Sequence, residues 1–497
     1  MPRSLSRFRL GLLALLIAAS GARAGAPVPA ALDAEARAQG SVRVIVQLAP
    51  AASRSARRTR QDDALARVAA GARAGARRYA HLDAVALEAT PQDLRALAAA
   101  PDVRALFVDG PLAAPTLDSS GPVVGATATR AAGFDGSGAA IAILDTGVDA
   151  QHPFLAGRVV AEACFSANGN CPNGLTTQIG PGAGRDCNFA SACFHGTHVA
   201  GIAASADPVY QGVAPGAQLV AVQIFSRFTG FDCSGTGSDP CALAWPSDIL
   251  AGADHVRTLA ATVPIVAANM SFGSGTYYGK SGCDNANVAM KQAIDALLAV
   301  GVATAAASGN DYWPDAMSAP GCISSAVGVG AVDDTDHVAL FSNSMYMLDL
   351  FAPGVLVRSS VPGGGTLTVN GTSMATPHVA GAFAVLRQAS PSAPVSALLT
   401  ALQNTGVPVV DTRPLAKNLT RPRIQVNLAV KSLAPAACYD SLDNDADGRI
   451  DFPADPDCQS GHDQSEQFIA ASCGIGPELA LALPLLGALR RRTRTRG

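Results

Sequence analysis

The order of apolar and polar positions divides the chain into a small N-terminal unit and a larger unit behind it. Residues 41–112 contain helical patterns between three strand-like apolar runs, at 42–48, 84–89 and 103–108. The arginine-rich stretch 61–78 has a helical composition, and Thr90 before Pro91 predicts a capped helix start. This strand-helix-strand-helix-strand order is typical of a split βαβ sandwich.

Residues 120–432 alternate short apolar runs with longer helical patterns, which predicts an α/β fold: a parallel sheet with helices on both faces. The run 139–144 is entered through Gly-Ser-Gly and left through Thr146 and Gly147, as expected of a buried central strand. That strand carries Asp145 at its C-terminal end, where sites gather in open α/β sheets.

Two helices are predicted to begin at polar residues. His195 precedes a run of small apolar residues, 199–204, and Ser373 has a similar setting, with Pro377 tolerated early in the helix. A helix N-terminus presents unpaired N–H groups and the positive end of the dipole. The backbone N–H of Ser373 can therefore stabilise a developing oxyanion.

Asp145, His195 and Ser373 together are the side chains of a nucleophilic hydrolase. A serine hydroxyl needs a base to take its proton, and an imidazole suits this because its pKa lies near neutrality. A buried carboxylate fixes the imidazole tautomer and stabilises the imidazolium that forms. Any one of these residues alone would more often be structural, but three long motifs in this order favour the catalytic interpretation.

The motifs at 142–148, 195–201 and 371–381 resemble those of subtilisin-like serine peptidases, the subtilases. The resemblance implies a subtilisin-like parallel sheet with helices on both faces, preceded by a small ferredoxin-like α+β prodomain. It also implies a serine endopeptidase for extended polypeptides, acting as a monomer without a catalytic cofactor.

By the same resemblance, Asn310 in the segment 305–310 supplies the second oxyanion donor, with Asn269 as the competing candidate. The substrate would pair with a strand edge lined by Ser271, Phe272 and Gly273. His152 is expected in a turn, and His198 as a packed or hydrogen-bonded neighbour of His195.

Rival classes of hydrolase lack their motifs. No Gly-x-Ser-x-Gly surrounds Ser373, which argues against an α/β-hydrolase, and the chain has no His-Glu-x-x-His, which argues against a zincin. Two other hypotheses stay open: a silent surface protein that uses this scaffold for binding, and a protein that processes only itself.

The unit at 41–112 resembles the inhibitory prodomain of subtilases, which implies an intramolecular inhibitor and self-cleavage within residues 109–120. The alternative is a stable N-terminal domain that is never removed.

The N-terminus has the pattern of a signal peptide. Three arginines precede the apolar run 10–19 and Ala-Arg-Ala ends at residue 24, so residues 1–24 are interpreted as a signal peptide. The protein is therefore expected to be secreted or held at the cell surface.

Composition adds a constraint on partners. The formal net charge is −3, although arginine is in excess both in residues 1–110 and in residues 474–497. The region between them is therefore acidic, which argues against nucleic acid as a partner.

All eleven cysteines lie beyond residue 160, without metal-ligand spacing, and an exported chain favours disulfides. Nearness in the sequence alone predicts five pairs and leaves Cys473 over. The pairs are Cys164–Cys171, Cys187–Cys193, Cys233–Cys241, Cys283–Cys322 and Cys438–Cys458. Four of these cysteines fall in an insertion at 164–193, just before His195, which compact subtilases lack.

A small C-terminal module, 438–466, contains a run of carboxylates at the spacing of an EF-hand-type calcium loop. Positions 1, 3, 5 and 9 are Asp443, Asp445, Asp447 and Asp451. Position 12 is Ala454, so the last ligand must come from Asp455, Asp457 or water. Calcium is expected here, with a solvated acidic turn as the alternative, whereas the loop 205–215 is too short for the calcium site of many subtilases.

Residues 473–497 combine a Cys-containing motif, an apolar run and a basic cluster. This arrangement resembles bacterial C-terminal sorting signals, with the arginines on the cytoplasmic side. Two outcomes are open: processing near Cys473 with loss of the tail, or a retained membrane anchor.

Overall fold

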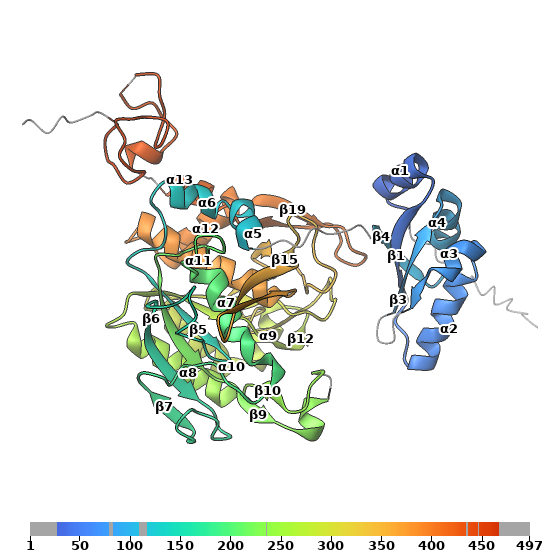
Figure 1. Ribbon diagram of the computed structural model, residues 1–497, viewed down its shortest axis with the longest axis horizontal. Coiled ribbons are helices and arrows are strands. Elements are labelled where there is room, and N and C mark those ends of the chain that lie inside the picture. Colours follow the sequence, from blue (N-terminus) through green and yellow to red (C-terminus); the bar gives the residue numbers. More distant parts are fainter. Residues whose placement is uncertain are drawn as a thin grey trace, which may run out of the picture. The chain divides into compact units, whose positions relative to one another are not determined.

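The computed structural model describes residues 27–78, 83–108, 117–234, 236–433, 436–445 and 447–466. The predicted signal peptide, the sorting segment and residues 109–116 of the expected cleavage window lie outside these residues. The chain forms two compact units, residues 1–112 and 113–497 (Figure 1).

The N-terminal unit is a four-stranded antiparallel sheet in the order β2-β3-β1-β4. Its strands are β1 (Val42–Leu48), β2 (Arg77–Arg78), β3 (Ala84–Ala89) and β4 (Val103–Val108). Its helices are α1 (Ala30–Gln39), α2 (Arg54–Leu65), α3 (Ala70–Ala74) and α4 (Pro91–Ala98). The helix predicted over 61–78 is therefore wrong at its end, because Arg77 and Arg78 pair with β3 as an edge strand.

Two helices of this unit can be compared with the elements that the sequence predicts. Thr90 caps α4 as predicted, since its hydroxyl accepts the Asp93 N–H and the Asp93 carboxylate accepts the Thr90 N–H. Helix α1 lies before residue 41, where the analysis placed no element. It belongs to the unit because Leu32 and Ala36 are fully buried in the same core as the strands.

The second unit is built on a ten-stranded sheet in the order β19-β20-β16-β15-β13-β11-β5-β8-β6-β7. The inner strands run parallel, and the edge strands β7 and β19 are antiparallel to their neighbours. The strands are β5 (Ala140–Asp145), β6 (Val159–Phe165), β7 (Thr177–Ile179), β8 (Gln218–Gln223), β11 (Ile265–Met270), β13 (Ala303–Ala307), β15 (Val327–Val332), β16 (Leu350–Pro353), β19 (Val407–Asp411) and β20 (Leu419–Arg423).

Three antiparallel pairs of short strands in the described part of this unit lie outside this sheet. They are β9 (Ser226–Phe228) with β10 (Cys241–Leu243), β12 (Ser274–Tyr277) with β14 (Met317–Ala319), and β17 (Val357–Val361) with β18 (Gly365–Val369). The helices are α5 (Leu117–Val123), α6 (Ala126–Ala131), α7 (His195–Ala204), α8 (Pro246–Leu259), α9 (Lys280–Ala286), α10 (Val288–Leu298), α11 (Thr372–Ala389), α12 (Val395–Thr405) and α13 (Val426–Ser432).

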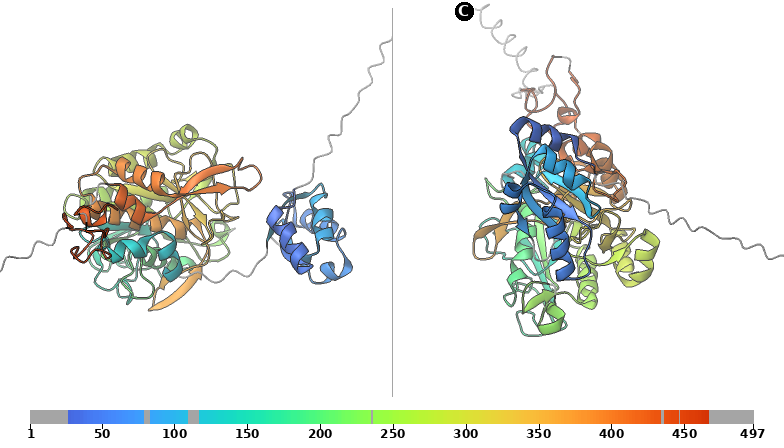
Figure 2. Two further views of the ribbon diagram at one scale, coloured as in Figure 1. Left: turned by 90° about the horizontal axis from the view of Figure 1, so that it is seen from above. Right: turned by 90° about the vertical axis from the view of Figure 1, so that its right-hand side faces the viewer.

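Strand β5 shows how the sheet separates two cores. Ile141 and Ile143 pack with α7 and α11 on one face, and Ala140, Ala142 and Leu144 pack with α8 and α10 on the other. Alternate side chains of a strand point to opposite faces, so a strand covered on both faces is apolar throughout. The predicted α/β fold is confirmed, and helices cover both faces of the sheet (Figure 2).

The structure contains five disulfides, and they join the same pairs that nearness in the sequence predicts. Cys283–Cys322 closes the longest loop, with a sequence separation of 39 residues, and both of its cysteines are fully buried. Within the described residues, no helix is long and apolar enough to cross a membrane.

Candidate active site

Asp145 is the last residue of β5 and is completely buried. Its Oδ1 lies 2.8 Å from Nδ1 of His195 and also accepts the Thr146 N–H at 2.7 Å. An ionised carboxylate only accepts, so Nδ1 must carry the hydrogen and Nε2 of His195 is left as the basic nitrogen. Oδ2 of Asp145 has no hydrogen-bond partner among the described residues.

His195 is the first residue of α7, and Thr146 ties this helix start to the end of β5. The Thr146 hydroxyl accepts the Gly196 N–H at 2.9 Å and donates to the Cys193 carbonyl at 3.2 Å. The backbones are so close that a Cβ at Gly196 would lie 2.1 Å from the Gly147 carbonyl oxygen. Glycine is thus required at position 196 by this contact.

The electrostatics of the two neighbouring histidines differ. Burial lowers the pKa of His195, but the charge and hydrogen bond of Asp145 outweigh it and raise that pKa above 6.5. Burial lowers the pKa of His198 to about 4, and its Nε2 bonds to the Leu367 carbonyl at 2.9 Å. His198 is therefore a neutral packed neighbour, as expected, and His152 lies in a turn with Nε2 on the Gly365 carbonyl.

Ser373 lies in the first turn of α11, and its backbone bonds outside the helix. Pro377, four residues on, has no N–H to donate to the Ser373 carbonyl. The Ser271 hydroxyl donates to that carbonyl instead, at 2.8 Å, while the Ser373 hydroxyl donates to the Ser271 carbonyl at 2.9 Å. Ser373 and Ser271 are thus joined by two reciprocal hydrogen bonds.

Asn310 follows β13 and is held against the start of α11. Its Oδ1 accepts both the backbone N–H and the hydroxyl of Thr372, each at 2.9 Å. Of the two amide atoms only the oxygen can accept from a backbone N–H, so the amide orientation is determined and Nδ2 is left as the donor. Asn310 is exposed, and its Nδ2 would lie 3.7 Å from a Cβ at Gly371.

The competing amide, Asn269, is located differently. It is fully buried within β11 and donates from Nδ2 to the Ser271 hydroxyl at 2.9 Å. Its Oδ1 has no hydrogen-bond partner among the described residues. Asn269 therefore orients Ser271, whereas Asn310 has a free donor beside Ser373.

The predicted substrate residues Ser271, Phe272 and Gly273 continue from the end of β11 in extended, irregular backbone. Phe272 and Gly273 line one side of an apolar cavity of about 540 Å³. Other walls include Leu243, Ala244, Ile249, Met290 and Pro320. The sequence analysis missed these residues, because they come from segments far apart in the chain that share no motif.

The insertion 164–193 contacts the end of β5 directly. The Cys187 N–H donates to the Thr146 carbonyl at 2.9 Å, and a Cβ at Gly147 would lie 2.1 Å from the Arg185 carbonyl oxygen. A second cavity, of about 400 Å³, is lined by Asp186, Cys187, Phe194 and Leu367. The insertion thus forms part of the surface beside His195.

The acidic C-terminal loop agrees only in part with the calcium-loop pattern. Carboxylate oxygens of Asp443, Asp445 and Asp447 lie within 4.8 Å of one another. Asp451, the expected ligand at position 9, does not belong to this group. It is buried, pairs with Lys431 at 2.9 Å and accepts the Ser441 N–H, so its charge is already compensated.

Comparison with known proteins agrees with this geometry. Residues 136–425, which include Asp145, His195, Asn310 and Ser373, match the model of the subtilase family. Alkaline protease of Alkalihalobacillus alcalophilus is 35% identical over 314 residues, which cover 62% of this chain and 70% of that protein. Subtilisin Savinase of Lederbergia lenta is 36% identical, with coverage of 54% and 83%.

Alkaline serine exoprotease A of Vibrio alginolyticus is 34% identical over 310 residues, which cover 62% of this chain. The matched region spans about half, 48%, of that relative.

Replacing Asp145 by Asn tests the electrostatic role of the buried carboxylate. In the unmodified protein, kcat/KM should fall as the pH drops through a His195 pKa above 6.5, because protonation blocks the base. With Asp145→Asn, burial remains without its counter-charge, so this acid limb should move to lower pH. The plateau of kcat/KM should fall roughly 10⁴-fold, because the tautomer is no longer held.

The measurement is kcat/KM on a chromogenic peptide from pH 5 to 10, with Asp207→Asn, in the loop after α7, as the control. An acid limb that stays in place in Asp145→Asn would contradict this account of the His195 pKa.

Replacing Ser271 by Ala tests whether its hydroxyl positions the nucleophile. The substitution leaves the Ser373 carbonyl without its donor, so kcat should fall about tenfold while KM stays within about twofold. Ser271→Thr retains a hydroxyl and should recover most of the loss. The measurement is kcat and KM of each variant by steady-state kinetics, with thermal unfolding to check that the variant is folded. A change in KM alone would refute the positioning role of Ser271.

Proposed function

This chain belongs to the subtilase family of serine peptidases, and we propose that it is a secreted endopeptidase that uses Asp145, His195 and Ser373 as its triad. The observation that carries the proposal is the 2.8 Å bond between the buried Asp145 carboxylate and His195 Nδ1. That bond leaves Nε2 basic, which is the requirement for a base that activates serine.

In the proposed reaction, the Ser373 hydroxyl breaks its hydrogen bond to the Ser271 carbonyl. It gives its proton to His195 Nε2 as its oxygen attacks the scissile carbonyl. The oxyanion of the tetrahedral intermediate accepts from the Ser373 N–H and Asn310 Nδ2. The imidazolium, stabilised by Asp145, then protonates the leaving amine, and water cleaves the acyl-enzyme by the same route. The reaction needs no cofactor.

The substrate is proposed to bind as an extended strand along Ser271, Phe272 and Gly273. Extended peptides pair with exposed backbone, and pockets beside the pairing strand select alternate side chains. The apolar cavity of about 540 Å³ next to Phe272 fits a large apolar side chain. We therefore expect a preference for leucine or phenylalanine at one substrate position.

The protein is proposed to be made as a zymogen, with residues 41–112 as its intramolecular inhibitor and self-cleavage within 109–120. The separate core of the N-terminal unit supports this, because a unit that folds by itself can be released whole. The protein is proposed to act as a monomer, with polypeptide substrates and this inhibitor as its partners.

Export by residues 1–24 is supported by the five disulfides, which form and persist outside the reducing cytosol. For residues 473–497, the proposal is a sorting segment that attaches the protein to the membrane or cell surface until it is cut near Cys473. Nucleic acid is not among the proposed partners.

Expression of the full chain beside Ser373→Ala tests the proposed function. Intact mass should show loss of a fragment ending within residues 109–120, and the processed protein should cleave casein until a serine-directed phosphonate is added. Ser373→Ala should stay full length and inert. If both proteins stay full length, and neither cleaves casein after another protease removes the N-terminal unit, the binding-scaffold hypothesis replaces this one.

A positional peptide library tests the apolar cavity. At one substrate position, leucine or phenylalanine should exceed alanine by about tenfold in kcat/KM, as burial of a large apolar side chain predicts. Ala244→Phe, which fills the cavity, should reduce that preference to about threefold or less. Ala299→Phe, at the exposed end of α10, is the control, and an equal effect of both variants would exclude the cavity as a specificity site.

A further inference from the structure

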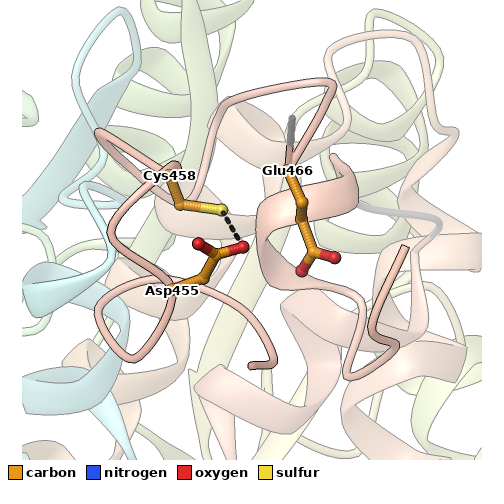
Figure 3. Close-up of side chains that lie close together, drawn as sticks. All are labelled: Asp455, Cys458 and Glu466. Atoms are coloured by element: carbon orange, nitrogen blue, oxygen red, sulfur yellow. Dashed lines mark hydrogen bonds between the residues drawn. The ribbon is translucent and has the colours of Figure 1, made fainter. Parts of the chain in front are cut away.

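Asp455 is a buried carboxylate with one oxygen that has no hydrogen-bond donor among the described residues. The residue is 1% exposed, and its Oδ1 accepts the Asp457 N–H at 2.8 Å. Oδ2 lies 3.9 Å from the sulfur of Cys458 (Figure 3). That sulfur belongs to the Cys438–Cys458 disulfide and carries no hydrogen, so it cannot donate.

Other carboxylates lie close to that of Asp455. Oxygens of Asp447, Asp455 and Asp457 lie within 4.8 Å of one another, and Asp447 is also a member of the group with Asp443 and Asp445. Glu466 lies near Asp455 as well, but its two oxygens already accept the N–H groups of Asn444 and Asp451 (Figure 3).

Positive charge from the protein does not offset these carboxylates. Arg449 is the one basic residue between 443 and 457. Among the described residues, no ion pair reaches the five aspartates of the two groups, whereas Asp451 has Lys431. An unpaired buried carboxylate is costly unless a cation compensates it.

We propose that Asp447, Asp455 and Asp457 bind one calcium ion, with Asp455 as the buried ligand. Calcium takes six to eight oxygen ligands in flexible geometry, which these three carboxylates supplemented by carbonyl or water oxygens can satisfy. Magnesium demands a tighter octahedral shell and gives up its water reluctantly, so a loop of many carboxylates selects calcium. This ligand set differs from the one predicted from the EF-hand-type spacing, because Asp455 and Asp457 join Asp447 in place of Asp443, Asp445 and Asp451.

The site lies in a module that is attached to the peptidase unit. The Gly461 N–H donates to the Ala132 carbonyl at 3.0 Å, and the His462 ring lies 4.1 Å from that of Phe134. Lys431 of α13 reaches both Asp451 and the Tyr439 ring. We expect the ion to order the acidic loop, whereas Asp451 attaches the module to α13 through its ion pair with Lys431.

Equilibrium dialysis with radioactive calcium on the full chain tests the site, with Ser373→Ala as the background to prevent self-digestion. After treatment with EDTA, the protein should bind one calcium ion per chain, and a large excess of magnesium should compete poorly. Asp455→Asn and Asp447→Asn should each weaken calcium binding at least about tenfold. Asp451→Asn is the matched control, and its affinity should stay within about threefold.

Circular dichroism in EDTA checks that each variant is folded, and Asp447, being exposed, keeps the test valid if Asp455→Asn unfolds. Absence of saturable binding, or a stoichiometry of two, would overturn the proposal. Loss of binding in Asp451→Asn, or retained binding in Asp447→Asn, would show that the ligand set is wrong.

Discussion

The close approach of Gly147 to Gly196 is the contact on which the catalytic geometry depends. It brings the start of α7 against the end of β5, so that His195 and Asp145 meet at hydrogen-bond distance. The Thr146 hydroxyl stabilises the same contact, because it accepts from the Gly196 N–H and donates to the Cys193 carbonyl. The sheet contributes by burying β5 on both faces, which leaves its last residue in a site shielded from water, where electrostatic interactions are strong.

A missing hydrogen bond positions Ser373 in a comparable way. Because Pro377 cannot donate, the Ser373 carbonyl is available to the Ser271 hydroxyl, which Asn269 in turn orients. Ser373 is thereby connected to β11, which neighbours β5 in the sheet. Local disruption of the helix thus connects the proposed nucleophile to the segment proposed to bind substrate.

The sequence predicted the local settings of the site well, because glycines and apolar runs mark where strands and helices meet. Asp145 at a strand end and His195 and Ser373 at helix starts follow from short-range patterns. The ion pair between Asp451 and Lys431 was missed, because a spacing pattern carries no information on the helix that brings Lys431 to that carboxylate. The walls of the apolar cavity and the contact between Ser271 and Ser373 were missed for the same reason, since both depend on tertiary packing. Helix α1 was not predicted, because few of its residues, such as Leu32 and Ala36, are buried and the apolar pattern is weak.

The most direct test of the catalytic account is the crystal structure of the processed protein after reaction with a serine-directed phosphonate. The account predicts a covalent bond from Ser373 Oγ to phosphorus and a phosphoryl oxygen within hydrogen-bond distance of both the Ser373 N–H and Asn310 Nδ2. The His195–Asp145 bond should persist in the adduct. An adduct oxygen that is bound by neither donor, or phosphorus attached to another residue, would contradict the account.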